Sequence, residues 1–197
     1  MSDKLFGSRI AGGNTAYGRK ESDFYPTPPE CTHALLDFLD LPAGTKIWEP
    51  AAGGGHIVNV LRGRGYEVRA TDIQTGTDFL QTEGTEGAEW IITNPPFSLA
   101  EEFILKALKY RREEKCYFAL LLKANYWNAK KRLALFEHCP PSWILPLTWR
   151  PDFLFKERGG GSPLMDVSWM VWGDTIAMYH GKSCSVFMPL AKPEEAE

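Results

Sequence analysis

Short apolar runs alternate with longer amphipathic stretches along most of the chain. Four of these runs have the length and continuity of strands covered on both faces, namely 46–49, 66–71, 90–93 and 117–122. Amphipathic segments separate them, and right-handed crossovers between successive strands build a parallel sheet with helices on both faces. The pattern therefore predicts an α/β fold with a mostly parallel, doubly wound sheet, formed by residues 23–190 as a single domain.

Capping and turn residues indicate where the helices begin and which strands come last. Thr27-Pro28-Pro29-Glu30 and Ser98-Leu99-Ala100-Glu101 both read as capping boxes, in which the first residue is the N-cap of the helix that follows. A further helix is expected around 130–137. Two late runs, 143–147 and 167–172, flank a glycine-rich loop and are expected to pair as antiparallel strands.

Composition narrows the class of protein further. The chain has 197 residues, of which 44% are hydrophobic, enough to bury the core of one domain. Residues 1–22 and 191–197 are polar, so a flexible N-terminal arm and a polar tail are expected. The four cysteines are far apart, and the one close Cys/His pair is the adjacent His138-Cys139, so no metal site is expected.

Location and charge add two weaker expectations. No apolar stretch reaches the ~18 residues of a membrane span, and the N-terminus lacks the pattern of a signal peptide, so a cytoplasmic protein is expected. The net charge of −3 counts against a dedicated nucleic-acid binder. Basic residues nevertheless cluster locally, and such patches can hold phosphates on an acidic protein.

A glycine turn and two carboxylates predict a nucleoside-containing cofactor. Gly53-Gly54-Gly55 follows the first strand and opens a helix, where absent side chains and free N–H groups let a ligand approach. Asp72 ends the next strand, where a carboxylate can bind both hydroxyls of a ribose. Glu49 would repel a pyrophosphate but attract an ammonium group. S-adenosylmethionine carries a ribose and an ammonium group, and it fits this set.

Other nucleotide signatures do not match. The sequence contains no Gly-x-x-x-x-Gly-Lys-Ser/Thr phosphate loop, and its glycine turn does not read Gly-x-Gly-x-x-Gly. Asp78 and Phe79 are candidates to hold an adenine, Asp78 by accepting from its amino group and Phe79 by packing on the ring. A turn aspartate beside a core phenylalanine is the alternative interpretation of this pair.

Asn94-Pro95-Pro96-Phe97 directly follows a buried strand and carries the most specific chemistry in the chain. An aromatic amine is a poor nucleophile because its lone pair is delocalised into the ring. Two acceptors for the amino hydrogens, the Asn94 side-chain oxygen and the Pro95 carbonyl, would aim that lone pair. The two prolines stiffen the loop, and Phe97 can stack on a target base. The tetrapeptide therefore predicts methylation of an amino nitrogen on a planar group.

Residues 23–123 resemble the class I S-adenosylmethionine-dependent amino-methyltransferases, which have a Rossmann-like fold. Asp23-Phe24-Tyr25-Pro26-Thr27-Pro28 looks like the Tyr-Pro-Thr-Pro segment of phage and bacterial DNA adenine N6-methyltransferases, and residues 48–55 resemble the first cofactor motif of the family. The resemblance implies that a small phage or prophage enzyme transfers a methyl group from S-adenosylmethionine to N6 of a flipped adenine in duplex DNA.

The resemblance also implies which residues form the site. The catalytic group would be Asn94, Pro95, Pro96 and Phe97. The cofactor contacts would be Tyr25, Thr27, Glu49, Pro50, Ala51, Gly53, Gly55, Asp72, Ile73, Asp78 and Phe79. In the family, the segment that matches Tyr25 and Thr27 borders the methionine end of the cofactor.

Target recognition is expected from short insertions, because no block of sequence resembles a separate recognition domain. Residues 125–132 and the loop at 149–166 mix basic and aromatic side chains, which contact phosphates and fill the space left by a flipped base. The predicted nucleic-acid contacts are Lys123, Tyr126, Trp127, Lys130, Arg150, Lys156 and Arg158. The alternative for the second stretch is an ordinary surface loop over the sheet edge.

Three other functions remain open on sequence alone. Methylation of RNA, at adenine N6 or guanine N2, uses the same tetrapeptide chemistry. No residue in the sequence indicates whether a ribose 2′-hydroxyl is recognised, so RNA stays open as a substrate. Protein glutamine methylation uses a related tetrapeptide that usually ends in tyrosine, whereas this one ends in Phe97. A cofactor-binding subunit without catalytic activity is the third, and the intact Asn94 and Pro95 argue against it. The oligomeric state is open as well.

Overall fold

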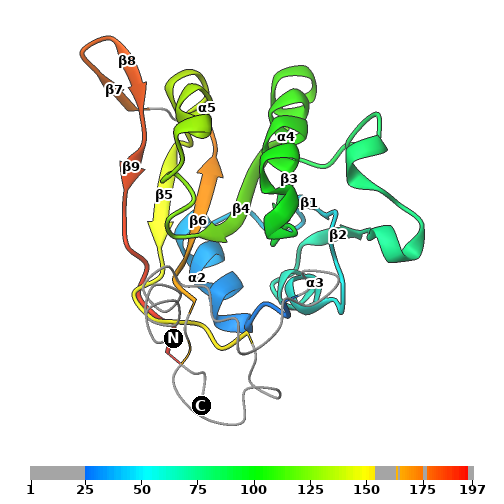
Figure 1. Cartoon of the computed structure of the whole chain (residues 1–197). Coiled ribbons are helices and arrows are strands. Elements are labelled where there is room, and N and C mark those ends of the chain that lie inside the picture. Colours follow the sequence, from blue (N-terminus) through cyan, green and yellow to red (C-terminus); the bar gives the residue numbers. More distant parts are fainter. Residues whose placement is uncertain (1–24, 154–162, 164, 175–176, 195–197) are drawn as a thin grey trace, which may run out of the picture.

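A seven-stranded sheet in the order β2-β1-β3-β4-β6-β5-β9 forms the centre of the molecule (Figure 1). The computed structural model describes residues 25–153, 163, 165–174 and 177–194. Four strands are parallel to one another: β1 (Lys46–Glu49), β2 (Glu67–Ala70), β3 (Trp90–Thr93) and β4 (Tyr117–Lys123). The sheet is completed by β6 (Val167–Trp172), antiparallel to β4, then β5 (Trp143–Pro146), antiparallel to β6, and β9 (Val186–Phe187), parallel to β5.

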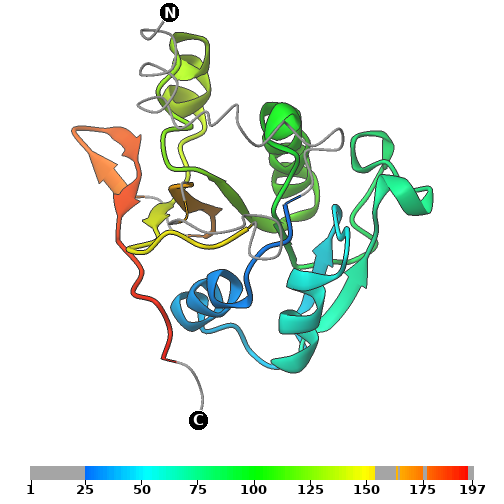
Figure 2. The same cartoon turned by 60° about the horizontal axis from the view of Figure 1, so that its bottom comes forward.

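Helices cover both faces of this sheet, which gives three layers (Figure 2). One face is covered by α2 (Pro29–Leu39) and α3 (His56–Gly63), and the other by α4 (Ala100–Glu114) and α5 (Leu133–His138). Successive residues of β3 alternate between the two cores: Trp90 and Ile92 pack with α2 and α3, and Ile91 packs with α4. Because both faces are buried, β3 and β4 read as continuous apolar runs.

The structure confirms the predicted α/β class, the four parallel strands and the late antiparallel pairing. The predicted helix at 130–137 is divided between the 3₁₀ turn η4 (Lys130–Arg132) and α5. Sequence periodicity gave no sign of β9 or of the hairpin formed by β7 (Ala177–Tyr179) and β8 (Lys182–Cys184), because each is only two or three residues long. Three further 3₁₀ turns are η1 (Ile73–Thr75), η2 (Phe79–Gln81) and η3 (Phe97–Leu99).

Both predicted capping boxes are wrong. Pro28 is the N-cap of α2, which has no side-chain cap, and the Thr27 hydroxyl instead accepts a hydrogen bond from Asn94. Leu99 is the N-cap of α4, because Ser98 lies one residue earlier in η3. In both segments the chain enters the helix later than the pattern indicates, which leaves Thr27 for a contact with a distant residue.

The strand order reverses at β1, since β2 lies on one side of it and β3 and β4 lie on the other. In open α/β sheets, ligands bind at the carboxyl ends of the strands at such a point. Glu49 ends β1, Asp72 follows β2, and Asn94 follows β3. The topology therefore brings three polar residues from distant parts of the sequence to one edge of the sheet.

Some expectations lie outside the described residues. They include the predicted arm at 1–22, part of the loop at 149–166 and the last three residues of the tail, so these expectations and the boundaries of the domain stay predictions. Among the helices that the structure does describe, none combines the length and the apolar character needed to cross a membrane.

Candidate active site

A cavity of about 460 Å³ opens at the carboxyl edge of the sheet, where the strand order reverses. It brings together most of the predicted cofactor contacts: Tyr25, Thr27, Glu49, Pro50, Ala51, Asp72, Ile73, Asp78 and Phe79. Asn94 and Pro96 of the predicted catalytic tetrapeptide line the same cavity. The cavity volume falls within the range of about 300–1,000 Å³ that is typical of small-molecule sites.

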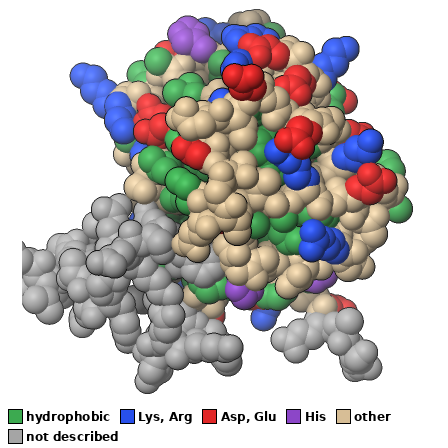
Figure 3. Space-filling view, turned by 90° about the vertical axis from the view of Figure 1, so that its right-hand side faces the viewer, with side chains coloured by type: hydrophobic (Ala, Val, Ile, Leu, Met, Phe, Trp, Pro, Cys, Tyr) green, Lys and Arg blue, Asp and Glu red, His purple; other side chains and the backbone are tan. Residues whose placement is uncertain are grey.

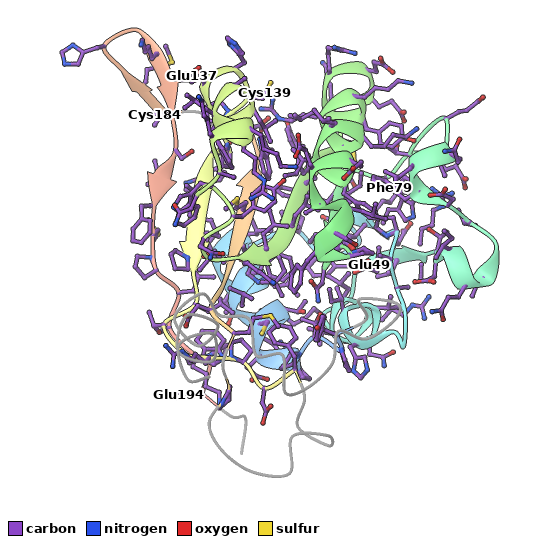
Figure 4. The ribbon with its side chains drawn as sticks, in the orientation of Figure 1. Glu49, Phe79, Glu137, Cys139, Cys184 and Glu194 are labelled. Carbon is purple, nitrogen blue, oxygen red and sulfur yellow. The ribbon has the colours of Figure 1, made fainter. Side chains whose placement is uncertain are left out.

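Glu49 is a buried carboxyl at the wall of this cavity, with 1% of its surface exposed (Figure 4). Its Oε1 accepts hydrogen bonds from the Ala51 N–H, at 2.9 Å, and from the Thr93 hydroxyl. Its Oε2 is buried without a partner among the described residues. Burial raises the pKa of Glu49 from its ordinary value of 4.5 to about 8, and a positively charged group beside Oε2 would stabilise the ionised form that burial disfavours.

Asp72 joins the end of β2 to the glycine turn. Its Oδ2 accepts from the Gly53 N–H and its Oδ1 from the Gln74 N–H, each at 2.8 Å. Gly53 and Gly55 have φ angles of +48° and +78°, a backbone region that favours glycine. Neither glycine is among the described residues that line the cavity. They shape the turn, and Asp72 presents its carboxylate beside that turn.

Ile73, Asp78 and Phe79 form the far side of the cavity. Ile73 is 68% exposed, so a large apolar side chain is accessible on the lining of the cavity next to Asp72. Asp78 caps η2 by accepting from the Leu80 N–H at 2.9 Å. Phe79 is 2% exposed and packs edge-on against Trp48, so it is chiefly a core residue that borders the cavity. In its packing, the pair is therefore a turn aspartate beside a core phenylalanine, which is the alternative interpretation that the sequence offered.

Asn94 is held in one orientation by two hydrogen bonds from its side-chain nitrogen. Nδ2 donates to the Thr27 hydroxyl at 3.0 Å and to the Tyr25 carbonyl at 3.3 Å. Because a carbonyl oxygen can only accept, the atom that faces Tyr25 must be the nitrogen. The Asn94 Oδ1 is buried and has no hydrogen-bond partner among the described residues. An unpaired acceptor is therefore left on a residue that lines the cavity.

The remaining residues of the tetrapeptide surround Asn94. Pro95 is buried and is not among the lining residues, whereas Pro96 lines the cavity and its carbonyl accepts from the Leu99 N–H at 2.9 Å. The Phe97 ring stacks on Tyr25, with ring centroids 5.8 Å apart. The Lys123 ammonium lies 5.1 Å from the centroid of the same ring. Phe97 is thus packed by an aromatic ring and a cation.

Several lining residues were not predicted from the sequence: Pro26, Ala52, His56, Ile57, Gln74, Ser98, Leu99 and Phe103. Most of them are neighbours of predicted residues, and adjacency to a motif was the available signal. Phe103 lies one helical turn inside α4, where its spacing indicated only a core position. His56 is the first residue of α3, and among the described residues that line the cavity it is the single basic side chain.

The predicted nucleic-acid contacts are only partly at the surface. Tyr126 is 6% exposed and packs against Phe136 and Arg132, so its ring belongs to the core, and its contact with nucleic acid stays a prediction. Lys123, Trp127, Lys130 and Arg150 are exposed, and Arg150 pairs with Asp166 at 2.7 Å. Lys156 and Arg158 lie outside the described residues.

Metal ligation finds no support in the part of the chain that is described, where no group of three or more His, Cys, Asp or Glu side chains gathers. The two cysteines in the core, Cys31 and Cys116, are buried thiols, and burial raises the pKa of each above its ordinary value. The polar groups of the cavity are instead carboxylates, an amide, hydroxyls and an imidazole, a set that suits an organic ligand.

Comparison with known proteins shows that the fold is similar to that of solved methyltransferases. No family model and no curated protein sequence matches the chain. The structure is similar to a type I restriction-modification methyltransferase subunit from Streptococcus thermophilus, with a TM-score of 0.53, 11% identity, and coverage of 91% of this chain and 55% of that one. It is similar to the modification subunit of a candidate type I restriction enzyme from Vibrio vulnificus, with a TM-score of 0.51, 12% identity, and coverage of 92% and 53%.

A third similar structure is a candidate RNA methyltransferase from Pyrococcus horikoshii, with a TM-score of 0.56, 14% identity, and coverage of 89% of this chain and 98% of that one. The chain thus spans about half the length of the two restriction-modification subunits but nearly all of the third protein. At these identities the similarity concerns the fold, which is the Rossmann-like methyltransferase fold.

The buried Glu49 makes a prediction about stability. Because its pKa is raised to about 8 on folding, the stability it contributes is present below about pH 4.5 and is lost as the pH rises through 8. Glu49→Gln removes this dependence. The free energy of unfolding of the variant, measured relative to that of the wild type, should therefore increase from pH 5 to pH 9, by on the order of a few kcal/mol. Urea unfolding at both pH values measures it, with Glu137→Gln on α5 as control. A stability difference that does not change with pH would contradict the burial argument.

Proposed function

We propose that the chain transfers a methyl group from S-adenosylmethionine to the N6 amino group of adenine in DNA. The observation that carries the proposal is the Asn94 Oδ1, a buried acceptor without a partner on a residue that lines the cavity. An acceptor in this state costs free energy unless a ligand donates to it. A donor such as an amino group on a planar ring satisfies it.

The cavity suits S-adenosylmethionine in its charges. Glu49 Oε2, buried and unpaired, would take the ammonium group, and Asp72 would take the ribose hydroxyls. The exposed face of Ile73 would pack on the adenine ring of the cofactor, with Asp78 beside its amino group. When bound, the cofactor supplies an electrophilic methyl group on a sulfonium. The site therefore offers one group for an ammonium and others for a nucleoside. This combination favours S-adenosylmethionine over a dinucleotide, which has no ammonium group.

The tetrapeptide would then prepare the amine. Asn94 Oδ1 accepts one amino hydrogen, and the Pro95 carbonyl accepts the other, because the Pro96 carbonyl is already engaged by Leu99. Two acceptors draw the lone pair out of the ring and favour the positive charge that develops on the nitrogen. Both acceptors lie on a loop that two prolines make rigid, so little reorganisation is needed. No general base is required, since the methylated ammonium loses its proton to water.

Phe97 is proposed to stack on the target base. Its ring already stacks on Tyr25 and lies close to the Lys123 ammonium. Lys123 is an exposed, flexible side chain, and a base that enters beside Phe97 can displace it toward a phosphate. The proposed base-stacking position and the proposed phosphate contact are therefore adjacent.

DNA is the preferred polymer because of the Tyr25-Pro26-Thr27-Pro28 segment, and the names of two similar structures point the same way. RNA is the second candidate, because the chain covers 98% of a candidate RNA methyltransferase at a TM-score of 0.56. Incubation with labelled S-adenosylmethionine and duplex DNA, single-stranded DNA or total RNA, followed by nucleoside mass analysis, separates them. N6-methyladenine in DNA supports the proposal. Label only in RNA, only in protein, or nowhere selects one of the alternatives.

Removal of the amide acceptor should abolish most of the activity. Asn94→Ala is expected to lower kcat by about 100-fold or more, as expected for loss of a hydrogen-bond partner that acts in the transition state. Cofactor affinity, measured by calorimetry, should change little, because Glu49 and Asp72 remain. Wild-type kcat in this variant would rule out the proposed role of Asn94.

Asp72 is expected to act on cofactor binding rather than on turnover. Asp72→Ala should weaken the affinity for S-adenosylmethionine by about tenfold or more, because it removes the ribose acceptor and also the anchor of the Gly53 and Gln74 N–H groups. Asp37→Ala, which removes an exposed carboxylate on α2, is the matched control. Equal affinities for the two variants by calorimetry would remove Asp72 from the site.

Phosphate contacts should make DNA affinity depend on salt. Lys130 is exposed in η4, and Lys130→Ala should make the slope of log K against log salt less negative by about 1 if its side chain contacts one phosphate. Lys182→Ala on β8 is the control. Fluorescence anisotropy over a salt series measures both slopes. A wild-type affinity that does not change with salt would exclude phosphate contacts as its source.

A further inference from the structure

The orientation of the Asn94 amide decides what the tetrapeptide can do. An amide presents an acceptor on one side and two donors on the other. With the oxygen toward the cavity it accepts an amino hydrogen. If the amide were rotated by half a turn, its own N–H groups would meet the hydrogens of the amine and oppose binding. The proposed chemistry therefore needs a residue that holds the amide in one of its two orientations.

Two groups from the segment that precedes α2 provide this hold. The Tyr25 carbonyl and the Thr27 hydroxyl both lie on the Nδ2 side of Asn94, at 3.3 and 3.0 Å. They are separated from Asn94 by 69 and 67 residues in sequence, so the contact depends on the tertiary fold. Thr27 is 4% exposed, which keeps water from competing for Nδ2.

Backbone and side chain contribute differently to this hold. The Tyr25 carbonyl is a backbone group and cannot be removed by substitution, and its distance to Nδ2 is the longer of the two. The Thr27 hydroxyl can be removed while the volume and shape of the side chain are kept. The same segment also packs the far end of the tetrapeptide, because the Tyr25 ring stacks on Phe97.

We propose that Thr27 is a positioning residue for the methyl transfer: its hydroxyl accepts from Asn94 Nδ2 and thereby keeps Asn94 Oδ1 directed at the target amine. The inference rests on the proposed function and deepens it. It differs from a contact with the methionine end of the cofactor, the role that the family resemblance implies. Thr27 lines the cavity, so both roles are open to it by position, and they predict different kinetics.

Two variants and a matched control separate the roles. Thr27→Val keeps the shape of the side chain and removes the acceptor, whereas Thr27→Ser keeps the hydroxyl. Thr32→Val is the control, because Thr32 is also fully buried, lies on the adjacent helix α2, and its hydroxyl has no partner among the described residues. For each protein, the dissociation constant of S-adenosylmethionine and the kcat at saturating cofactor and DNA are measured.

The positioning role predicts a loss in kcat. Thr27→Val should lower kcat by about tenfold, the effect of one lost hydrogen bond, with the cofactor dissociation constant within about twofold of wild type. Thr27→Ser should keep kcat within about threefold of wild type, and Thr32→Val should leave it unchanged. A Thr27→Val variant that binds the cofactor weakly but reaches wild-type kcat at saturation would overturn the proposal, as would equal losses in the valine and serine variants.

A spectroscopic measurement keeps this test independent of the proposed function. The Asn94 side-chain N–H₂ resonances are identified as the pair that disappears in Asn94→Ala. Thr27→Val should shift them strongly, whereas Thr27→Ser and Thr32→Val should leave them close to wild type. Resonances that do not respond to Thr27→Val would overturn the proposed hold. If the resonances respond as expected but wild-type protein methylates no nucleic acid, the hold is supported and the proposed function fails.

Discussion

The buried carboxyl of Glu49 is the interaction on which the site depends. Its Oε1 accepts from the Ala51 N–H of the turn after β1 and from the hydroxyl of Thr93 at the end of β3. The turn after β1 and the end of β3, which leads into the tetrapeptide, are thereby fixed to one group at the point where the strand order reverses. Burial of a carboxyl is costly, and its second oxygen has no partner among the described residues.

The Asn94 amide is arranged in the same way as the Glu49 carboxyl: the protein binds one of its two polar atoms and leaves the other unpaired. Tyr25 and Thr27 engage the amide nitrogen, and the oxygen is unpaired. Both unpaired atoms belong to residues that line one cavity, a carboxyl and an amide at the ends of adjacent strands. We interpret this pair as a charge-matched cofactor position beside a hydrogen-bonding position for the amine.

Local sequence predicted the parts of this arrangement that are themselves local. The apolar runs of β3 and β4 indicated strands because both faces of the sheet are covered, and the residues at the strand ends followed from the parallel topology. Thr27 was misread as a helix cap because the capping pattern is local, whereas its partner Asn94 lies 67 residues away. The burial of Tyr126 could not be predicted from the sequence, because it depends on Phe136 and Arg132, which pack on it only in the folded chain.

The sequence also did not show which basic side chains pair within the protein and which are free to contact a partner. Arg64 pairs with Asp37, and Arg69 pairs with Glu86 and lies over the Trp48 ring, so both of these basic side chains interact within the protein. On the face seen from the β2 side, acidic and basic side chains are intermixed (Figure 3). Lys123 and Lys130 are exposed, and Lys123 lies beside Phe97, so we propose these two side chains as phosphate contacts.

We propose that Asn94 Oδ1 accepts a hydrogen from the target amine beside a cofactor held by Glu49. A crystal structure with sinefungin, a non-reactive analogue of the cofactor, and an adenine-containing duplex tests it most directly. We expect the adenine N6 atom about 2.7–3.2 Å from both Asn94 Oδ1 and the Pro95 carbonyl oxygen, and the ammonium group of the analogue beside the Glu49 carboxylate. An Asn94 oxygen turned toward Thr27, or an analogue bound elsewhere, would contradict it.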